Sequence, residues 1–159
     1  SINIIKSMKV VLLENLRKLG NIGETINVKR GYARNFLIPQ KKALFASEKN
    51  LKEVEKIKSD LNKKDQEKKK AAKEIADKLK NKTFEVKKLV TENKELYGSV
   101  KPTEISKLIT EIDKIEIKPA MIEPIKEIKS IGKFRVKISL HSEVDAEIFI
   151  NVVSAETIQ

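Results

Sequence analysis

The stretch that most constrains the fold is residues 47–82, which contain no glycine and no proline. Apolar residues keep helical spacing at its two ends, whereas residues 62–70 contain none. A helix that is polar on all sides does not belong in a protein core, so it either connects domains through solvent or is unstable. We therefore predict one long, exposed connecting helix over residues 48–82, with Ser47 as its N-cap.

Acid-to-base pairs in the favourable order support this helix across its polar middle. The pairs four residues apart are Asp60–Lys64, Asp65–Lys69 and Glu74–Lys78. A coiled coil needs an apolar seam over three or four heptads, and here the seam lapses for more than one heptad. A single helix of this length would extend for about 50 Å. The pattern therefore predicts a spacer between two small domains.

The excess positive charge of the chain lies before and within this helix. Residues 1–50 carry ten basic and three acidic side chains, whereas residues 81–159 carry thirteen of each. A localised basic excess favours a polyanionic partner, because neutralised phosphates release condensed counterions. Lysine makes up 30 of the 34 basic residues, which is also typical of an AT-rich genome. That bias does not explain the unequal distribution of charge along the chain.

Residues 8–47 predict a basic domain near the lower size limit for independent folding. Residues 9–13 are a β-branched apolar run and residues 24–28 alternate polar with apolar side chains, so we predict both as strands. Residues 29–37 predict a short helix that ends before a proline, and residues 43–45 predict a third strand. We expect a three-stranded antiparallel sheet with one short helix.

Residues 83–155 predict a second domain, which is electrically neutral. Its predicted elements are, in order, a strand at 84–86, a loop at 95–99, a helix from Pro102 to Ile112, a strand at 115–117, a helix over 125–131 that ends at Gly132, and an antiparallel hairpin of strands 134–140 and 146–152. The helices follow from apolar spacing of three and four residues, and the hairpin follows from strict alternation. The predicted fold class is α+β, with two small α+β domains joined by one long exposed helix and a C-terminal sheet that carries two helices.

Several runs of residues carry a family resemblance. The N-terminal signature of the ninth protein of the bacterial large ribosomal subunit (ribosomal protein L-nine) resembles the run Gly20-x-x-Gly23-x4-Val28-x-x-Gly31-Tyr32-x-x-Asn35-Phe36-Leu37. Other parts of the resemblance are Met8-Lys9-Val10, the long helix, Leu96-Tyr97-Gly98-Ser99-Val100 and Leu140-His141-x-Glu143-Val144. It covers about Met8 to Val153. A signature with this many fixed positions is far more specific than a lone glycine-rich loop.

The resemblance implies a structural protein of the large ribosomal subunit that supports translation and maintenance of the reading frame. Its N-terminal domain would bind large-subunit (23S-type) ribosomal RNA near the base of the stalk by the exit site. Its helix would project the C-terminal domain away from the particle. The implied partners are this RNA, other ribosomal proteins near the exit-site stalk and a neighbouring ribosome. The implied location is the ribosome in the bacterial cytoplasm, with an organellar ribosome as the alternative.

The chain departs from the family pattern at three places. Lys41 stands where glycine is common, and a lysine with positive φ there would cost about 1 kcal/mol. Lys101 precedes Pro102 where a Thr or Ser cap is usual, which removes a capping hydrogen bond. Residues 1–7 precede the usual start at Met8, and three origins stay open for them: a genuine extension, a misassigned start codon or a remnant of expression.

Folded RNA presents phosphates and 2′-hydroxyl groups, which cations on a rigid surface can bind. We expect the cations of the glycine-punctuated loop and of the short helix to converge at one end of the small sheet. Glycines in these segments permit either tight turns or close approach of the RNA backbone. The candidate RNA-binding residues are Arg17, Lys18, Gly20, Gly23, Lys29, Arg30, Gly31, Tyr32, Arg34, Asn35, Lys41 and Lys42.

Two of these residues have alternative roles. Tyr32 either stacks on an unpaired base or packs in the core with Phe36, which is four residues further along. Asn35 either caps the turn or bonds the RNA. Phe36 and Leu37 are assigned to the core. The candidate secondary contacts in the C-terminal domain are Tyr97, Ser99 and Lys101.

The sequence argues against catalysis and against metal or cofactor binding. The absence of cysteine excludes disulfide scaffolds, thiolate zinc sites and cysteine nucleophiles. The one histidine, His141, has Ser142 and Glu143 beside it in a predicted hairpin loop, which is typical of a turn and not of a catalytic triad. No phosphate-loop or dinucleotide fingerprint occurs, and no apolar run approaches the about 18 residues of a membrane span. We expect no enzyme activity, cofactor, metal, membrane or small-molecule substrate.

A non-ribosomal adaptor is the alternative function. In that case the long helix would pair with a partner helix and the basic domain would bind an acidic protein. RNA binding that weakens steeply with salt favours the ribosomal interpretation. Partner capture that survives nuclease favours the adaptor.

Overall fold

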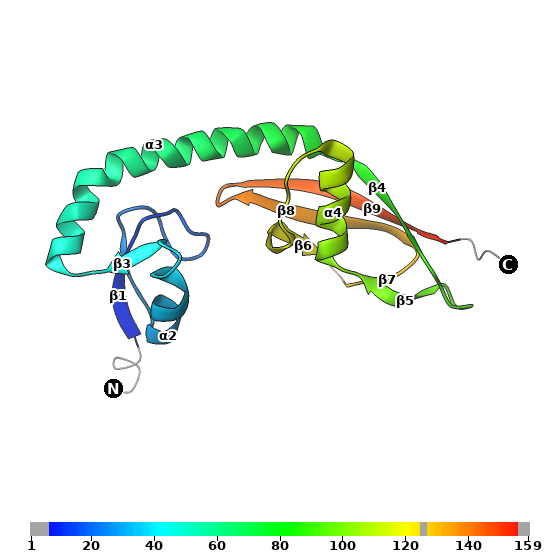
Figure 1. Cartoon of the computed structure of the whole chain (residues 1–159), viewed down its shortest axis with the longest axis horizontal. Helices are drawn as coiled ribbons and strands as arrows, with labels where there is room; N and C mark the ends of the chain where they lie inside the picture. Colours follow the sequence, from blue (N-terminus) through cyan, green and yellow to red (C-terminus); the bar gives the residue numbers. More distant parts are fainter. Residues whose placement is uncertain (1–6, 125–126, 156–159) are drawn as a thin grey trace. The chain divides into compact units, whose positions relative to one another are not determined.

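The computed structural model describes residues 7–124 and 127–155, and the chain divides into two compact units between Lys70 and Ala71 (Figure 1). The elements of the first unit are β1 (Ser7–Leu12), β2 (Thr25–Lys29), α2 (Arg30–Tyr32), the π-helical turn η1 (Ala33–Leu37) and β3 (Ala43–Phe45). The helix α3 (Glu48–Leu79) runs from the first unit into the second. The second unit contains β4 (Thr83–Lys88), β5 (Glu95–Val100), α4 (Pro102–Asp113), the 3-10 turn η2 (Pro119–Met121), β6 (Ile122–Pro124), β7 (Ile128–Ser130), β8 (Gly132–His141) and β9 (Val144–Ser154).

The first unit contains the predicted three-stranded antiparallel sheet, in the order β2-β1-β3. Its core brings together apolar residues from the sheet and from the short helix, namely Val10, Leu12, Val28, Ala33, Leu37 and Ala43. Leu12 and Leu37 are both 0% exposed, and burial of each contributes about 1.5–3 kcal/mol. The prediction that Leu37 belongs to the core is therefore confirmed, whereas Phe36 is half-buried.

The short helix predicted over residues 29–37 is present as α2 followed by η1. The backbone N–H of Ile38 donates to the carbonyl of Ala33 at 2.9 Å, an i→i+5 bond that widens the last turn. The chain then turns back through Lys41, whose φ is 58°. The turn therefore keeps the left-handed backbone that commonly takes glycine, and the lysine there costs about 1 kcal/mol.

The long helix is confirmed as α3, and it ends at Leu79. The backbone N–H of Asn50 donates to Ser47 Oγ at 3.2 Å, so Ser47 caps the helix as predicted. Between Val54 in the first unit and Ala72 in the second, α3 has no buried residue. The polar middle of the helix, residues 62–70, is therefore exposed to solvent apart from Asp65 and Lys69, which are half-buried.

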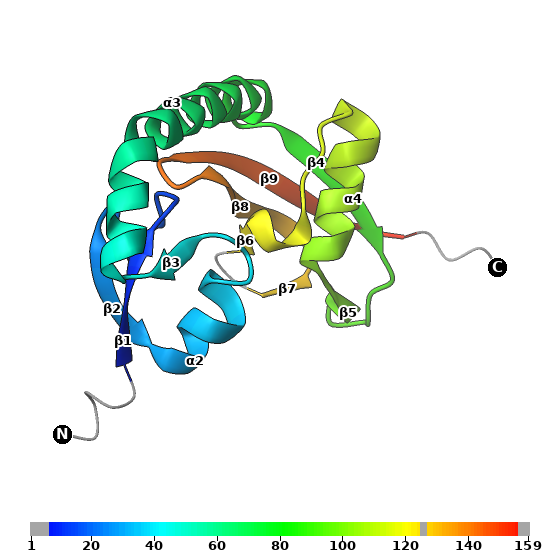
Figure 2. The ribbon, with the colours of Figure 1, turned by 60° about the vertical axis from the view of Figure 1, so that its left-hand side comes forward.

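The second unit has a four-stranded sheet in the order β4-β9-β8-β6 and a two-stranded sheet of β5 and β7. Strands β8 and β9 form the predicted antiparallel hairpin, and β4 is parallel to β9. Helix α4 begins at Pro102 as predicted, and its N-cap Lys101 makes no side-chain hydrogen bond. Ile105 and Ile109 of α4 are fully buried in a core shared with the four-stranded sheet (Figure 2).

Three predictions for the second unit are wrong. The predicted helix over 125–131 begins at residues 125–126, which lie outside the described residues, and continues where the structure has strand β7. The described part of this unit therefore carries one α-helix beyond α3 instead of the two predicted. Residues 95–99, predicted as a loop, lie in strand β5, and residues 115–117, predicted as a strand, form no strand.

The pairing of β5 with β7 explains two of these errors. Val100 lies opposite Ile128, and Glu95 lies opposite Ser130. Ile128 is 1% exposed while its neighbour Lys129 is exposed, which is the alternation of a strand. Strand formation here depends on a partner far along the chain, so the spacing of apolar residues within either segment is insufficient to predict it.

Neither of the described ranges, 7–124 and 127–155, includes a helix that is long and apolar enough to cross a membrane.

Candidate nucleic-acid interface

The predicted RNA-binding residues lie on three surface segments of the first unit. The loop between β1 and β2 carries Arg17, Lys18, Gly20 and Gly23. The end of β2 and the turns of α2 and η1 carry Lys29, Arg30, Gly31, Tyr32, Arg34 and Asn35, and the turn before β3 carries Lys41 and Lys42. Below, Arg17 and Lys18 are called the loop cations, and Lys29, Arg30 and Arg34 are called the helix cations.

The helix cations are exposed, and no carboxylate of the described residues neutralises them. Lys29, Arg30 and Arg34 are all exposed, and none of them forms an ion pair with a residue that the structure describes. Lys18 in the loop has the same two properties. Cations that no described carboxylate pairs with keep their potential for a polyanion.

Cations of the second unit are arranged differently, because many of them face carboxylates. Its ion pairs include Lys82–Asp113 at 2.9 Å, Arg135–Glu147 at 2.9 Å, Lys137–Glu123 at 3.6 Å, Lys137–Asp145 at 3.6 Å and Lys88–Glu104. Carboxylates of this region therefore neutralise several of its cations locally.

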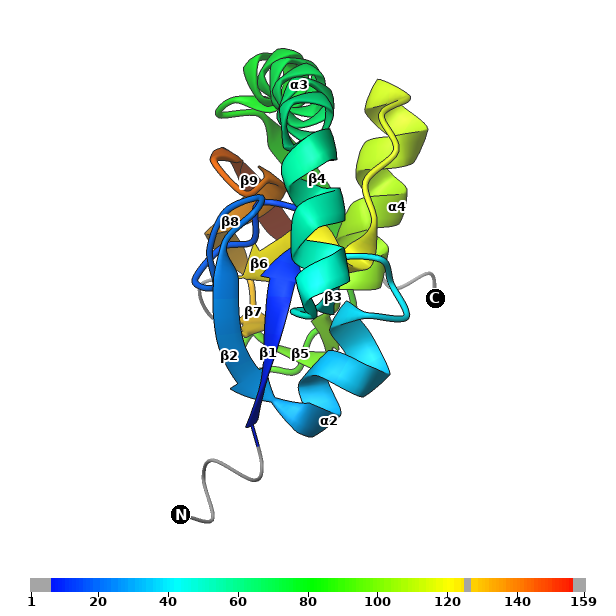
Figure 3. The same ribbon diagram turned by 90° about the vertical axis from the view of Figure 1, so that its left-hand side faces the viewer.

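Lys29 and the β1–β2 loop, which carries the loop cations, lie at opposite ends of the β1–β2 hairpin, so the cations do not all converge at one end of the sheet as predicted. Ser7 pairs with Lys29 at one end, and Val11 pairs with Thr25 at the end from which the loop leaves. Four residue steps separate these pairs, about 14 Å at about 3.4 Å per residue. Figure 3 shows α2 at one end of β1 and β2 and the loop at the other. The candidate interface is therefore elongated along the sheet.

Lys41 and Lys42 belong to the loop end of this surface. The backbone N–H of Leu13, at the start of the loop, donates to the carbonyl of Lys42 at 2.9 Å. Lys41 is exposed, whereas Lys42 is half-buried with its Nζ 5.0 Å from the centre of the Phe36 ring. This cation–π contact fixes the Lys42 ammonium group close to the short helix.

The three glycines of the candidate interface fall into two groups. A Cβ atom on Gly20 would lie 2.7 Å from Glu24 Oε2, and Gly23 has φ 85° and packs against Lys58. Gly31 has no positive φ, and the nearest atom to a Cβ there, among the described residues, is Asn35 Nδ2 at 3.9 Å. Gly20 and Gly23 therefore serve the turn, whereas nothing within the described protein requires a glycine at position 31.

Tyr32 and Asn35 both present polar groups on the outer side of the short helix. Tyr32 is 39% exposed while one side of its ring stacks on Phe36, so it is a surface aromatic supported by the core. Asn35 is exposed, and its side chain forms no hydrogen bond with a residue that the structure describes. The alternative that Asn35 caps the turn is therefore wrong.

Asn15 organises the loop, although no sequence motif identifies it. Its Oδ1 accepts the backbone N–H of Ile22 at 2.7 Å and so joins the two sides of the loop. Its Nδ2 donates to Asp65 Oδ2 on α3 at 2.8 Å. The partners are fifty positions apart, so no local pattern signals the contact.

The candidate secondary contacts of the second unit lie on and beside β5. Tyr97 is 74% exposed, Ser99 is half-buried two positions further along the strand, and Lys101 is exposed. The pairing of β5 with β7 shifts register between Glu95 and Val100, the stretch that contains Tyr97 and Ser99. A Cβ atom on Gly98 between them would meet no atom within 4 Å.

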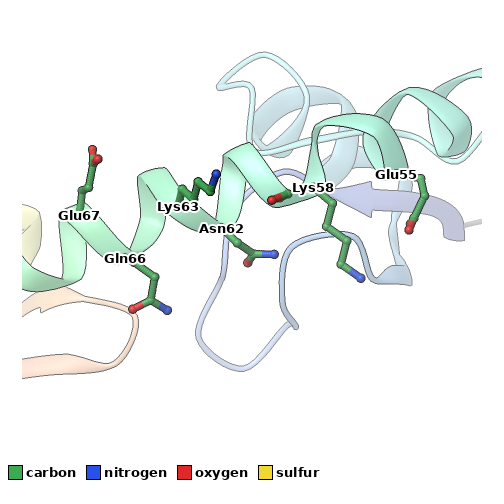
Figure 4. Close-up of a pocket in the computed structure, with 7 residues that line it drawn as sticks. Glu55, Lys58, Asn62, Lys63, Gln66 and Glu67 are labelled. Atoms are coloured by element: carbon green, nitrogen blue, oxygen red, sulfur yellow. The ribbon is translucent and has the colours of Figure 1, made fainter.

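Other features of the described chain give no sign of a catalytic or metal site. His141 Nδ1 accepts the backbone N–H of Glu143 at 3.1 Å, which is a turn contact within the β8–β9 hairpin. Over residues 7–124 and 127–155, no three His, Asp or Glu side chains are grouped so that they could hold a metal ion. A hollow beside α3 is lined by polar residues of that helix, and Lys58, Asn62 and Gln66 project to the same side (Figure 4).

Comparison with known proteins gives matches over almost the whole chain. Residues 8–54 match the family "Ribosomal protein L9, N-terminal domain", and residues 70–154 match the family "Ribosomal protein L9, C-terminal domain". The chain is 72% identical over 152 residues to the large ribosomal subunit protein bL9 of Pelagibacter ubique (strain HTCC1062), which covers 96% of this chain and 100% of that protein.

More distant relatives agree with this match. The chain is 43% identical to the large ribosomal subunit protein bL9 of Bartonella quintana (strain Toulouse) and 41% identical to that of Brucella canis (strain ATCC 23365 / NCTC 10854 / RM-666), each over 145 residues. Those alignments cover 91% of this chain and 75% and 76% of the two relatives. The chain, with an α+β unit at each end of a long polar helix, therefore belongs to the bL9 family of large ribosomal subunit proteins.

Proposed function

We propose that the chain binds large-subunit (23S-type) ribosomal RNA through a basic N-terminal domain, residues 8–47. The observation that carries this proposal is the exposure of the helix cations, which no described carboxylate neutralises, on the unit that holds the excess charge. Phosphate contacts from such cations position a protein on folded RNA and release counterions. The RNA-binding residues are those of the loop, the short helix and the turn through Lys41 and Lys42.

The elongated shape of this surface suits an RNA backbone. Lys29 and the start of the β1–β2 loop lie at opposite ends of β1 and β2, about 14 Å apart along the strands. Successive phosphates of one duplex strand are separated by only about 3.4 Å along the helix axis. Lys29 and the loop cations therefore engage different phosphates, and the sheet between them sets their separation.

The connecting helix, residues 48–82, serves as a spacer that projects a neutral C-terminal domain, residues 83–155. The continuous helical backbone of α3 and its solvated polar middle support this role. Membership of a large-subunit protein family supports contacts with ribosomal proteins near the exit-site stalk, contact with a neighbouring ribosome and a contribution to maintenance of the reading frame. In the C-terminal domain, Tyr97, Ser99 and Lys101 provide a secondary contact with RNA through the exposed side of β5.

The role proposed here is structural and not catalytic. Family membership also argues against the non-ribosomal adaptor, for which neither unit of the described structure offers a specific observation. The bacterial relatives support a location on the ribosome in the bacterial cytoplasm.

Directed cleavage of ribosomal RNA tests this proposal. The chain has no cysteine, so a single introduced cysteine carries an iron chelate without side reactions. Large subunits that hold the Asn21→Cys protein, labelled in the β1–β2 loop, should show strong cleavage confined to one segment of the RNA. Labelling at Lys107→Cys on α4 is the control. Cleavage from position 107 with none from position 21 would overturn the assignment of the RNA-binding domain.

A further inference from the structure

The β1–β2 loop is fastened to the long helix by the side chain of Asn15. Asn15 Oδ1 accepts the backbone N–H of Ile22 at 2.7 Å, and Asn15 Nδ2 donates to Asp65 Oδ2 at 2.8 Å. Both Asn15 and Asp65 are half-buried. One amide group therefore closes the loop and binds the closed loop to α3.

Packing around this amide strengthens the attachment of the loop to the helix. Ile22 is 5% exposed, and a Cβ atom on Gly23 would lie only 3.0 Å from Lys58 Cε. Leu13 and Ile22 of the loop and Ile57 and Leu61 of the helix line one small hollow. The loop therefore lies against α3 over about two turns, which end at Asp65.

The attached loop has a defined backbone conformation at the position of its cations. Leu16 and Gly20 form a two-way backbone bridge, with N···O distances of 2.8 and 3.1 Å. Lys18 lies between them with φ 69°, a left-handed conformation that costs a non-glycine residue about 1–2 kcal/mol. A conformation of this kind persists only where surrounding contacts determine it.

We infer that Asn15 and Asp65 are positioning residues for RNA binding, and that α3 acts as a splint which holds the β1–β2 loop in its RNA-binding conformation. This inference rests on the proposed function and adds that the helix takes part in recognition. A loop released from the helix populates the binding conformation only part of the time, and the apparent affinity falls in proportion.

Because Asp65 is acidic, the direction in which its replacement changes RNA affinity tests the inference. If Asp65 acted only through its charge, its removal near a polyanion would strengthen RNA binding. If Asp65 instead positions the loop, its removal weakens RNA binding even though the protein becomes more positive. Glu67, exposed on the same helix, is a matched control for the change of charge.

Binding of the full-length variants to deproteinised large-subunit RNA provides the test. Asp65→Ala should bind about three- to tenfold more weakly than the original protein, because the loop loses a charge-assisted hydrogen bond. Glu67→Ala should bind equally well or more tightly. If both variants bind more tightly by the same factor, Asp65 acts through its charge alone and the inference is wrong.

An exchange of the two side chains separates positioning from misfolding. Asn15→Asp alone places two carboxylates face to face, so RNA binding should weaken. Adding Asp65→Asn restores a donor facing an acceptor, keeps the original net charge and should return affinity to within about twofold, since a hydrogen bond of similar geometry reforms. Failure of the exchange to restore binding, in a protein that unfolds at the original temperature, would overturn the inference.

Lys18 provides a readout that a purely structural role does not change. In the original protein, log affinity for RNA falls as log salt concentration rises. Lys18→Ala should make this fall less steep by about 1, which is the contribution of one phosphate contact. In the Asp65→Ala background it should change the slope little, because Lys18 has already lost its position. If Lys18→Ala changes the salt dependence by the same amount with and without Asp65→Ala, the inference is wrong. RNA binding by the Arg30→Glu, Arg34→Glu protein tests the proposed function without involving Asn15 or Asp65. A failure of the proposed function can therefore be told apart from a failure of the inference about these two residues.

Discussion

The rings of Tyr32 and Phe36 stack with their centroids 5.2 Å apart and an interplanar angle of 13°. Phe36 is half-buried against the core, whereas Tyr32 is 39% exposed. The core therefore holds an aromatic ring in a fixed orientation at the surface, beside the helix cations. A fixed, exposed ring is the arrangement on which an unpaired base stacks.

Replacement of Tyr32 should separate its packing from its contact with RNA. Tyr32→Leu should lower the free energy of unfolding by about 0.5–1.5 kcal/mol through loss of the aromatic pair. It should also weaken RNA binding by about 1–3 kcal/mol through loss of base stacking. Tyr32→Phe should change both quantities little. Urea denaturation and RNA titration measure the two effects.

Phe45 is a suitable control for Tyr32, because it is another exposed aromatic residue of the first unit, at 41% exposure. Phe45→Leu should leave RNA affinity unchanged. If Tyr32→Leu also leaves RNA affinity unchanged, Tyr32 only packs on Phe36 and belongs outside the interface.

Gly31 should matter for RNA binding and not for folding. A Cβ atom at this position meets no described atom closer than 3.9 Å, and alanine favours a helical turn by about 0.5–1 kcal/mol over glycine. Gly31→Ala should therefore keep or raise the melting temperature while it weakens RNA binding, because the added methyl group blocks close approach of the backbone. Gly23→Ala should instead destabilise the unit, since φ is 85° and Lys58 lies in contact. Equal RNA affinity of the Gly31→Ala protein would exclude a close approach there.

Lys41→Gly should stabilise the first unit. Lys41 has φ 58°, and relief of a left-handed lysine is worth about 1 kcal/mol, partly offset by the larger unfolded-state entropy of glycine. We expect a net gain of about 0.5 kcal/mol in urea denaturation. Gln40→Gly is the control and should destabilise, because its backbone is not left-handed. A loss of stability for Lys41→Gly would show that side-chain contacts of Lys41 outweigh its backbone strain.

Elements whose signal lies within one segment are predictable from the sequence. The alternation from Phe134 to Leu140 predicts strand β8, and the solvated middle of α3 follows from the lack of apolar residues over 62–70. Strand β7 is different, because Ile125, Ile128 and Ile131 fit helical spacing equally well. Its strand conformation depends on pairing with β5, which only the three-dimensional fold supplies.

The candidate interface is likewise predictable only in part. Its residue types and their basic surplus are visible in the sequence, but their arrangement is not. The register that pairs Ser7 with Lys29 places Lys29 at the end of the sheet away from the loop cations. Likewise, the contact of Asn15 with Asp65 depends on how α3 passes the loop. In both cases the missing information is a contact between residues far apart in the chain.

Charge reversal tests whether the first unit binds ribosomal RNA through its exposed helix cations. Arg30→Glu with Arg34→Glu changes the charge of that unit by the same amount as Lys107→Glu with Lys118→Glu changes that of the second, and all four residues are exposed. The measurement is the affinity of each full-length double variant for large-subunit RNA as a function of salt. We expect the first pair to abolish binding even at low salt, whereas the second pair should leave both the affinity and its salt dependence close to those of the original protein. If the first pair keeps RNA binding and the second pair loses it, the RNA-binding surface does not lie on the helix cations of the first unit.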